Sequence, residues 1–280
     1  MAPQARVEPD DELFSSIRCT VLAAGQYAFA PGWRLARTSA PHYRMFVATD
    51  GAASFSIGDR SHALAAGGVV LVPPHTPHEA RHHPAAPLSA YVIDFEAKLH
   101  GVLDVAEVCG LPVSLMPSAL RRPKFAASAH AIAHHLAGRI PGYQLAVHSH
   151  CLRLLDLLWK EALARGARGG ELLRFRPVFT LVERRFGERL TLRDLADTVH
   201  LHPAYFSASF KRAAGVGPHE FVARYRLERA RDLLVASDLP LDQIARRTGF
   251  FDAAHLVRVF RRHEGTSPGR YRRAHASGAA

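Results

Sequence analysis

The sequence predicts a two-domain α+β protein. An N-terminal antiparallel β-barrel carries a helical hairpin, and an all-α C-terminal domain holds two helix-turn-helix motifs joined by a linker helix. Three observations support this fold class: a pattern that repeats near the C-terminus, short β-like runs broken by turns in the first hundred residues, and two stretches of helix formers between them. A chain of 280 residues is long enough for two separate cores.

The C-terminal repeat lies between Leu192 and Pro268. Its copies begin with LRDLA at Leu192 and LDQIA at Leu241, and each ends in Gly-x-x-Pro. Equivalent residues are 49 apart at the start and 50 apart later, so one residue is inserted at the bend. Because each copy has two apolar-periodic segments around a short break, the repeat predicts helix-turn-helix motifs over residues 192–214 and 241–263.

Local signals place the helices inside each copy. In the first copy, a supporting helix should follow Thr191, and a recognition helix should open at Pro203, where a missing N–H costs nothing, and end before Gly215. In the second copy, Asp252 is the expected N-cap of the recognition helix. The buried faces should carry Phe206 and Phe210 in the first recognition helix, and Leu256 and Phe260 in the second.

A single helix over Pro218–Ala236 should join the two copies. Its 19 residues make a rod of roughly 28 Å at about 1.5 Å per residue. Successive major-groove faces on one side of B-DNA lie about 34–36 Å apart. The sequence therefore predicts that one chain reaches two adjacent turns of a duplex.

The outward faces of the two recognition helices supply the candidate DNA contacts. Short or bidentate side chains near the helix starts are candidates for touching base edges: Ala204, Ser207, Ala208, Ala254, His255 and Arg258. Side chains placed for phosphates are Tyr205, Lys211, Arg212, Arg261 and Arg262. Arg258 alone among the outward residues suits a bidentate contact to guanine, so the second copy is expected to specify the sequence and the first to hold the backbone. The alternative is a solvated helix face, but matched basic pairs in both copies favour DNA.

Composition and charge agree with a nucleic-acid partner. With 48% hydrophobic and 22% charged residues, the chain is typical of a globular protein and not of a disordered one. The formal net charge is +11, and residues 171–280 hold 20 Lys and Arg against 12 Asp and Glu, so most of the surplus lies with the repeat. The three cysteines, Cys19, Cys109 and Cys151, show neither a disulfide framework nor zinc spacing, which predicts a reducing cytoplasm. No secretory signal or apolar run of about 20 residues is present, so no membrane association is expected.

The N-terminal half shows strand-like runs at residues 43–48, 53–57, 69–72 and 88–95, with hairpin signals at Asp50-Gly51 and Gly58-Asp59. Residues 97–123 give no clear assignment. Helices are expected over 124–139 and 143–165, and the second carries a stripe that either packs on the barrel or forms a dimer seam: Leu145, His148, Leu152, Leu155, Leu158 and Trp159.

The C-terminal hundred residues resemble the AraC/XylS family of bacterial transcription regulators. The resemblance rests on "LTLRDLA", "YFSASFKRAAGVGPHEFVARYRLERARDLL" and "IARRTGFFDAAHLVRVFRRHEGTSPGRYRR". It implies a regulator that binds double-stranded DNA, with RNA polymerase as a further candidate partner. The family's base-reading Arg in the first recognition helix is replaced here by Ala208, and His202 stands where Ser is usual, whereas the second-helix Arg matches Arg258.

The segment "HYRMFVATDGAASFSIGDRSHALAAGGVVLVPPHTPHEA" resembles the cupin-like sensor domain of that family. The resemblance implies a small-molecule effector in the barrel and a homodimer. The polar start predicts a frayed N-terminus over 1–14, and the glycine-rich stretch after the second helix predicts a linker over 166–171. The remaining domains are a cupin-like sensing domain (15–123), a helical hairpin (124–165) and an AraC-type DNA-binding domain (172–275). His42 and His78 are the candidates for hydrogen bonding to the effector.

Two alternatives compete with this regulator. The first is a metal-dependent cupin enzyme fused to a DNA-binding tail. Such an enzyme needs a close His-x-His with a later Glu, but His42 is followed by Tyr43-Arg44, and Glu79 directly follows His78. The second is a co-regulator that only dimerises with another DNA-binding protein. The sequence therefore favours a non-enzyme with no catalytic residues, metal or cofactor.

Overall fold

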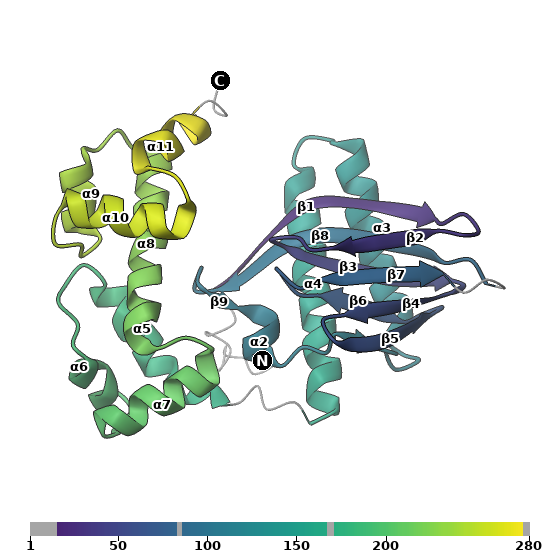
Figure 1. Ribbon diagram of the computed structural model, residues 1–280, viewed down its shortest axis with the longest axis horizontal. Coiled ribbons are helices and arrows are strands. Elements are labelled where there is room, and N and C mark those ends of the chain that lie inside the picture. The colour runs from purple at the N-terminus through teal and green to yellow at the C-terminus, as the bar shows by residue number, and fades with distance from the viewer. Residues whose placement is uncertain (1–15, 83–85, 167–170, 277–280) are drawn as a thin grey trace, which may run out of the picture. The chain divides into compact units, whose positions relative to one another are not determined.

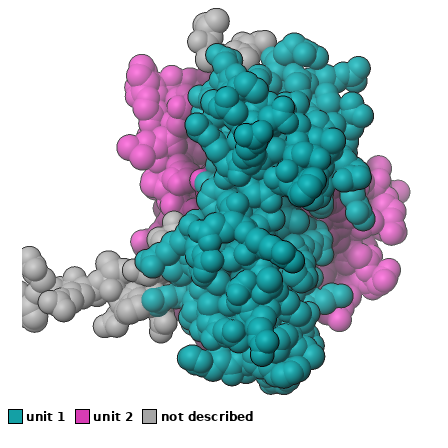
Figure 2. All heavy atoms as spheres, turned by 90° about the vertical axis from the view of Figure 1, so that its left-hand side faces the viewer, with its two compact units in different colours: residues 1–16, 99–103, 170–280 teal, residues 17–98, 104–169 magenta. Residues whose placement is uncertain are grey.

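The computed structural model describes residues 16–82, 86–166 and 171–276, which divide between two compact units (Figure 2). The N-terminal unit takes residues 17–98 and 104–169, and the C-terminal unit takes residues 1–16, 99–103 and 170–280. The segment expected to fray, 1–14, and most of the expected linker, at 167–170, lie outside the described residues. No helix in the described ranges is both long and apolar enough to cross a membrane.

The N-terminal unit contains two antiparallel sheets (Figure 1). One has the strand order β1-β8-β3-β6-β10, with β9 paired to β8, and the other has the order β2-β7-β4-β5. The strands are β1 (Ile17–Ala28), β2 (Arg34–Thr38), β3 (Tyr43–Asp50), β4 (Ala52–Ile57), β5 (Arg60–Ala65), β6 (Val69–Val72), β7 (His78–His82), β8 (Ser89–Leu99), β9 (Leu103–Asp104) and β10 (Ser114–Leu115). The expected antiparallel β domain is confirmed. Gly58-Asp59 joins the hairpin of β4 and β5, but the hairpin expected at Asp50-Gly51 is wrong, because β3 and β4 lie in different sheets.

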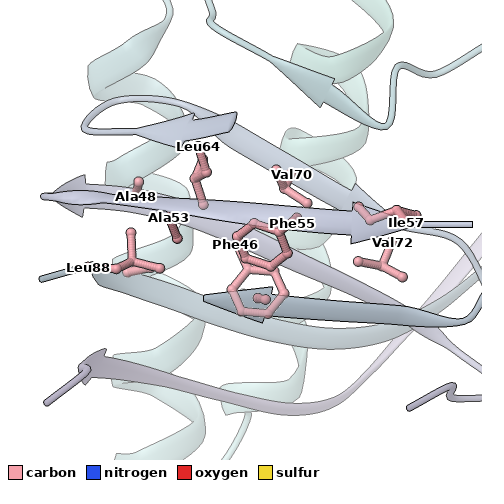
Figure 3. Packing of buried hydrophobic residues seen from close by; sticks show 11 residues of the cluster. Phe46, Ala48, Ala53, Phe55, Ile57, Leu64, Val70, Val72 and Leu88 are labelled. Atoms are coloured by element: carbon pink, nitrogen blue, oxygen red, sulfur yellow. The ribbon is translucent and has the colours of Figure 1, made fainter. Parts of the chain in front are cut away.

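Side chains from both sheets meet in one apolar core (Figure 3). Phe46 of β3 and Phe55 of β4 lie at its centre, with ring centroids 4.7 Å apart. Strand β3 is buried on both faces, since Phe46 and Ala48 point into this core while Met45 and Val47 are buried on the opposite face. Burial on both sides explains why residues 45–48 form a continuous apolar run.

A helical hairpin follows the barrel strands: α3 (Arg122–Gly138) and α4 (Tyr143–Ala164). Both helices pack against β1 (Figure 1). The expected stripe on α4 is only partly buried, because Leu155 and Leu158 are in the core while Leu145 is 77% exposed. The buried face is centred instead on Val147, Cys151, Leu154 and Leu158. Residues 97–123 hold β9, β10 and the short helix α2 (Val105–Cys109).

The C-terminal unit is helical, as expected. Its elements are η3 (Leu173–Phe175), α5 (Arg176–Arg185), α6 (Leu192–Asp197), α7 (Pro203–Ala214), α8 (Pro218–Ala236), α9 (Leu241–Arg247), α10 (Ala253–Glu264) and α11 (Pro268–Ala276). Figure 1 shows α8 running from the α6–α7 pair to the α9–α10 pair. The core around the first pair is an aromatic cluster that includes Phe175, Phe179, Phe210 and Phe221. The core around the second pair includes Leu234, Ile244, Leu256 and Phe260.

Candidate nucleic-acid interface

The first helix-turn-helix fixes its recognition helix through local hydrogen bonds and a phenylalanine anchor. A capping box starts α6: the Thr191 hydroxyl accepts from the Asp194 backbone N–H at 3.2 Å, and the Asp194 carboxylate accepts from the Thr191 N–H at 2.7 Å. Helix α7 then begins at Pro203 without a side-chain cap and ends at Gly215 in the left-handed conformation. Phe206 and Phe210 are fully buried. This anchoring decides which face of α7 remains open.

The second copy uses a stronger cap. The Asp252 carboxylate accepts a hydrogen bond from the His255 backbone N–H at 2.6 Å, which satisfies one orphan donor at the start of α10. Leu256 and Phe260 are fully buried, and the helix ends at Gly265 in the left-handed conformation. The structure therefore confirms Asp252 as an N-cap, whereas His202, which precedes α7, makes no capping bond with its side chain.

Most of the predicted contact residues lie on the open faces. The exposed ones are Ala204, Tyr205, Ala208, Lys211, Arg212, Ala254, Arg258, Arg261 and Arg262. Ser207 is half-buried, and so is His255, whose ring meets Phe250 edge-on with centroids 5.5 Å apart. Ser207 and His255 are therefore the least accessible of the base-reading candidates.

Ion pairing separates the basic side chains discussed here into two groups. Arg185, Arg224 and Arg229 each pair with a nearby carboxylate: Glu188, Glu220 and Asp232. In contrast, the five basic side chains on the recognition helices form no hydrogen bond or ion pair with any other described residue: Lys211, Arg212, Arg258, Arg261 and Arg262. Unpaired guanidinium and ammonium groups on an exposed helix face are available to phosphates and base edges.

Two half-buried arginines of the same unit hold its backbone. Arg226 donates to the carbonyl oxygens of Phe186 at 2.8 Å and Glu188 at 2.6 Å, and burial lowers its pKa. Arg272 donates to the carbonyls of Leu234 and Leu239. These side chains are structural, although composition alone does not distinguish them from the five free ones.

The sequence interpretation did not single out Phe251. This residue lies in the turn before Asp252 and is 90% exposed. Arg246 and Arg247, at the end of α9, are also exposed. The one sequence signal for Phe251 as a candidate contact residue is an apolar side chain within a predicted turn.

A second candidate site lies inside the N-terminal unit. A cavity of about 240 Å³ opens between the sheets, next to the core in Figure 3, lined by Ala23, Ala24, Tyr27, Phe29, Trp33, Leu35, Arg44, Phe46, Val92 and Asp94. Arg44 Nε and Nη2 each donate to Asp94 at 2.7 Å, which raises the pKa of the Arg44 guanidinium. The rings of Phe29 and Trp33 lie 4.2 Å apart. The cavity thus combines aromatic walls with one bidentate ion pair.

Of the two effector candidates, only His42 lies next to a residue that lines this cavity. His42 Nε2 approaches Asp94 Oδ2 at 3.3 Å but lacks hydrogen-bond geometry with it. His78, on β7, is only 1% exposed; its Nδ1 meets the Thr76 carbonyl at 3.0 Å, and its Nε2 has no partner. Neither histidine lines the cavity, and among the described residues no group of three or more His, Cys, Asp or Glu could hold a metal ion.

Two family models match the chain. An AraC-like ligand binding domain matches residues 22–158, and a helix-turn-helix domain matches residues 195–274. The first covers the sheets and most of the hairpin, and the second covers most of the C-terminal helices.

Several transcriptional regulators are similar in sequence. YijO of Escherichia coli (strain K12), named an uncharacterized HTH-type transcriptional regulator, is 30% identical over 129 residues, 46% of this chain and 44% of that protein. The HTH-type transcriptional activator RhaS of Citrobacter koseri is 33% identical over 117 residues, 42% of each chain. The regulatory protein PocR of Salmonella typhimurium is 37% identical over 91 residues, 32% of this chain and 30% of that protein. The chain thus spans less than half the length of each of these relatives.

Solved structures are also similar. The DNA-binding domain of AdpA in complex with a target DNA is 28% identical, covering 37% of this chain and 96% of that chain with a TM-score of 0.35. ToxT of Vibrio cholerae with a bound unsaturated fatty acid is 14% identical, covering 90% and 95% with a TM-score of 0.41.

Proposed function

Because the chain belongs to the AraC family of transcription regulators, we propose that it binds double-stranded operator DNA through α7 and α10 and responds to a small effector held in its N-terminal unit. One observation carries the proposal: five basic side chains without partners lie on the exposed faces of two recognition helices, one in each helix pair beside α8. The single long helix between the two pairs supports simultaneous contact with two turns of a duplex.

The two recognition helices differ in the chemistry they offer. The open face of α7 combines Ala204 and Ala208 with Lys211 and Arg212 near its end, so it suits the phosphate backbone and at most thymine methyl groups. The open face of α10 adds Arg258, which is exposed and unpaired and can form a bidentate contact to guanine. We infer that α10 specifies the operator sequence and that α7 mainly supplies affinity.

Gel retardation of the DNA upstream of the chain's own gene, over a range of salt concentrations, tests the proposal. Binding should weaken steeply with salt, and Lys211→Ala should lower the slope of log K against log salt by about 1, uniformly across sequences. Arg258→Ala should weaken specific binding by about 10- to 100-fold and relax the preference at one guanine position. Arg60→Ala, an exposed unpaired arginine on β5, serves as the matched control and should leave both quantities unchanged.

The outcomes separate the alternatives. If no salt or effector condition gives retardation, the DNA-binding function is wrong. If guanine contacts map under α7 alone, the division of roles between the helices is wrong while the function remains. A co-regulator that only dimerises would show neither salt-dependent retardation nor an Arg258 effect.

The cavity between the sheets supports the effector part of the proposal. Its aromatic walls and the Arg44–Asp94 pair fit a small neutral molecule with an apolar face and both donors and acceptors. His42, beside Asp94, and the partnerless Nε2 of His78 remain candidates for further hydrogen bonds.

Further parts of the proposal concern assembly and surroundings. Exposed Leu145 and half-buried Leu152 and Trp159 leave an apolar strip on α4 that fits a homodimer seam. RNA polymerase is a candidate partner of the DNA-bound form, and a cytoplasmic, non-enzymatic role is consistent with relatives named as transcriptional regulators.

A further inference from the structure

Two cysteines and a histidine come together where the barrel meets its hairpin. Cys19 lies on β1, and His148 and Cys151 lie one helical turn apart on the face of α4 that packs on β1. The Cys19 Sγ is 3.6 Å from His148 Nδ1, and the same ring nitrogen lies 3.1 Å from the Cys19 carbonyl oxygen. The Cys19 thiol also faces the His148 carbonyl at 3.9 Å. These contacts place one imidazole nitrogen against both the thiol and the backbone carbonyl of Cys19.

The second thiol completes the cluster. Cys151 lies one helical turn after His148, and its side chain interacts with that of Cys19 where α4 packs on β1. Both cysteines are free and buried, with exposed fractions of 5% and 1%. A pair of reduced thiols in mutual contact is the starting arrangement for a disulfide.

A pocket leads to one member of the pair. It has a volume of about 310 Å³ and is lined by Cys19, Thr20, Val21, Leu136, Tyr143, Gln144, Val147 and His148. Cys151 is not among the lining residues. Small molecules therefore reach Cys19 first, next to the His148 ring, while Cys151 stays behind it.

The electrostatics distinguish the two sulfurs in the same way. The hydrogen bond from Cys151 holds the pKa of the Cys19 thiol below its usual range, against the opposite effect of burial. The hydrogen bond to Cys19, together with burial, raises the pKa of Cys151. Because the pocket is lined by Cys19 and not by Cys151, Cys19 is the thiol placed to react with a small molecule, and the thiolate is the nucleophilic form.

Cys109 provides an internal comparison. It is also buried, at 3% exposure, but burial and the charge of Asp104 raise its pKa to about 12. No hydrogen-bonding partner of its thiol is found among the described residues. Its surroundings are those of an inert structural cysteine.

We propose that Cys19 and Cys151 are a peroxide-reactive thiol pair, in which Cys19 attacks a small hydroperoxide in the pocket and Cys151 then closes a disulfide that ties β1 to α4. In the first step the Cys19 thiolate bonds to the terminal peroxide oxygen, the O–O bond breaks, and the leaving alkoxide or hydroxide takes a proton, giving Cys19 sulfenic acid and an alcohol or water. In the second step the Cys151 sulfur displaces the sulfenic hydroxyl, which leaves as water with the thiol proton. Overall, two thiols lose two electrons and the peroxide gains them.

Thiol mapping of the full-length protein tests this pair directly. The reduced protein is exposed to a slight excess of hydrogen peroxide, quenched, alkylated under denaturing conditions and digested for mass spectrometry. The expected result is a Cys19–Cys151 disulfide with Cys109 still fully alkylated. In Cys151→Ser the second step is blocked, so dimedone should trap sulfenic acid on Cys19. In Cys19→Ser, Cys151 should remain reduced, and Cys109→Ser should behave as wild type.

The role of His148 has its own readout, the rate of Cys19 oxidation. His148→Ala should slow this rate, because the ring nitrogen that lies 3.6 Å from the Cys19 Sγ is then missing. His148→Gln keeps a hydrogen-bond donor but cannot carry the proton, so it should stay slow if His148 exchanges the proton and should recover the wild-type rate if His148 only holds the backbone. Far-ultraviolet circular dichroism checks that each variant is folded.

Three results would overturn the proposal. The first is oxidation of Cys109 as fast as Cys19 in the folded wild-type protein. The second is a Cys151→Ser variant, folded by circular dichroism, that yields no dimedone adduct on Cys19. The third is stoichiometric Zn²⁺ that protects both thiols from alkylation and from peroxide, since the cluster would then be a metal site. DNA binding plays no part in these measurements, so their outcome is independent of the proposed function.

Discussion

Glu161 on α4 illustrates how one buried charge is held in place. It is only 4% exposed, and its Oε1 accepts from the Ser118 N–H and hydroxyl at 3.1 Å and from Arg121 at 3.0 Å. Burial alone would raise the pKa of Glu161, but the hydrogen bonds from Arg121 and Ser118 and the Arg121 charge outweigh it, so the pKa lies below its ordinary value. A depressed folded-state pKa means that ionised Glu161 stabilises the fold.

The expected cost of Glu161→Gln is about 1–3 kcal/mol in the free energy of unfolding at pH 7, since a charge-assisted set of hydrogen bonds is weakened. The sign with pH follows from the depressed pKa: the contribution is complete above the unfolded value, about 4.3, and is lost as pH falls through the folded value. Urea unfolding at pH 7 and near pH 3 measures both. Asp156→Asn, which removes an exposed pair with Lys160, should cost less than about 1 kcal/mol. A Glu161→Gln penalty of equal size at both pH values would contradict this account.

Residue by residue, the sequence predicts outward-facing positions better than partners. Arg258 and Lys211 are exposed because helical periodicity places them opposite Leu256, Phe260, Phe206 and Phe210. The same periodicity cannot show that His255 is half-covered by Phe250. Nor can it show that the carboxylate of Glu161 is buried, since its partners Ser118 and Arg121 lie outside α4.

Among the elements, helices were easier to predict than strands. The start of α10 at Asp252 and the bounds of α7 and α8 follow from local signals, because Asp caps, Pro at the first turn and Gly at the end act within a few residues. The sequence does not predict β1 as a defined strand. It is an edge strand whose pairing with β8 is non-local and whose side chains are mostly half-buried or exposed, so its sequence lacks clean alternation.

The turn between α9 and α10 depends on Gly249. Its φ is +75°, and an added Cβ would lie 2.4 Å from the Phe186 carbonyl oxygen and 2.8 Å from Arg226 Nε, the very pair joined by a hydrogen bond. Gly249→Ala should therefore cost about 3 kcal/mol or more, from left-handed strain together with displacement of Arg226. Gly265, with φ +66° and no atom near an added Cβ, is the matched control, and Gly265→Ala should cost only about 1–2 kcal/mol. If urea unfolding shows that Gly249→Ala and Gly265→Ala lose the same free energy of unfolding, the cost at Gly249 comes from backbone strain alone and not from the Phe186–Arg226 contact.

For the whole molecule, the sequence predicts two units because charge and pattern change along the chain. The basic surplus and helical periodicity lie in residues 171–280, while alternating runs dominate the first hundred residues. The effector cavity was beyond prediction, because its lining comes from β1, β2, β3, β8 and the loop at Trp33, and only folding brings these segments together. The sequence named His42 and His78 instead, since histidines are visible without knowing which side chains converge.

A regulator with an effector site in one unit and DNA-reading helices in the other must obey thermodynamic linkage. If the effector changes the affinity for the operator by some factor, typically about 5- to 150-fold, the operator must change the affinity for the effector by the same factor. A thermal-shift panel of small neutral molecules that have an apolar face together with hydrogen-bond donors and acceptors would supply the ligand. Calorimetry would then measure the Kd of the ligand with and without a saturating operator duplex. It would also measure the Kd of the operator with and without the ligand. The two ratios should agree.

Arg44→Met tests whether this linkage begins in the cavity between the sheets. Removing the guanidinium breaks the bidentate pair with Asp94 at the polar end of the cavity, so the ligand should bind at least about tenfold more weakly, as expected for one charge-assisted contact. Operator affinity without ligand should stay close to wild type, and Arg60→Met should change neither. A ligand that binds the Arg44→Met variant unchanged must occupy another site. A different outcome is a ligand that needs Arg44 but has the same Kd with and without the operator. Such a ligand would bind this cavity without regulating DNA binding, because it would not favour one conformation of the protein over the other.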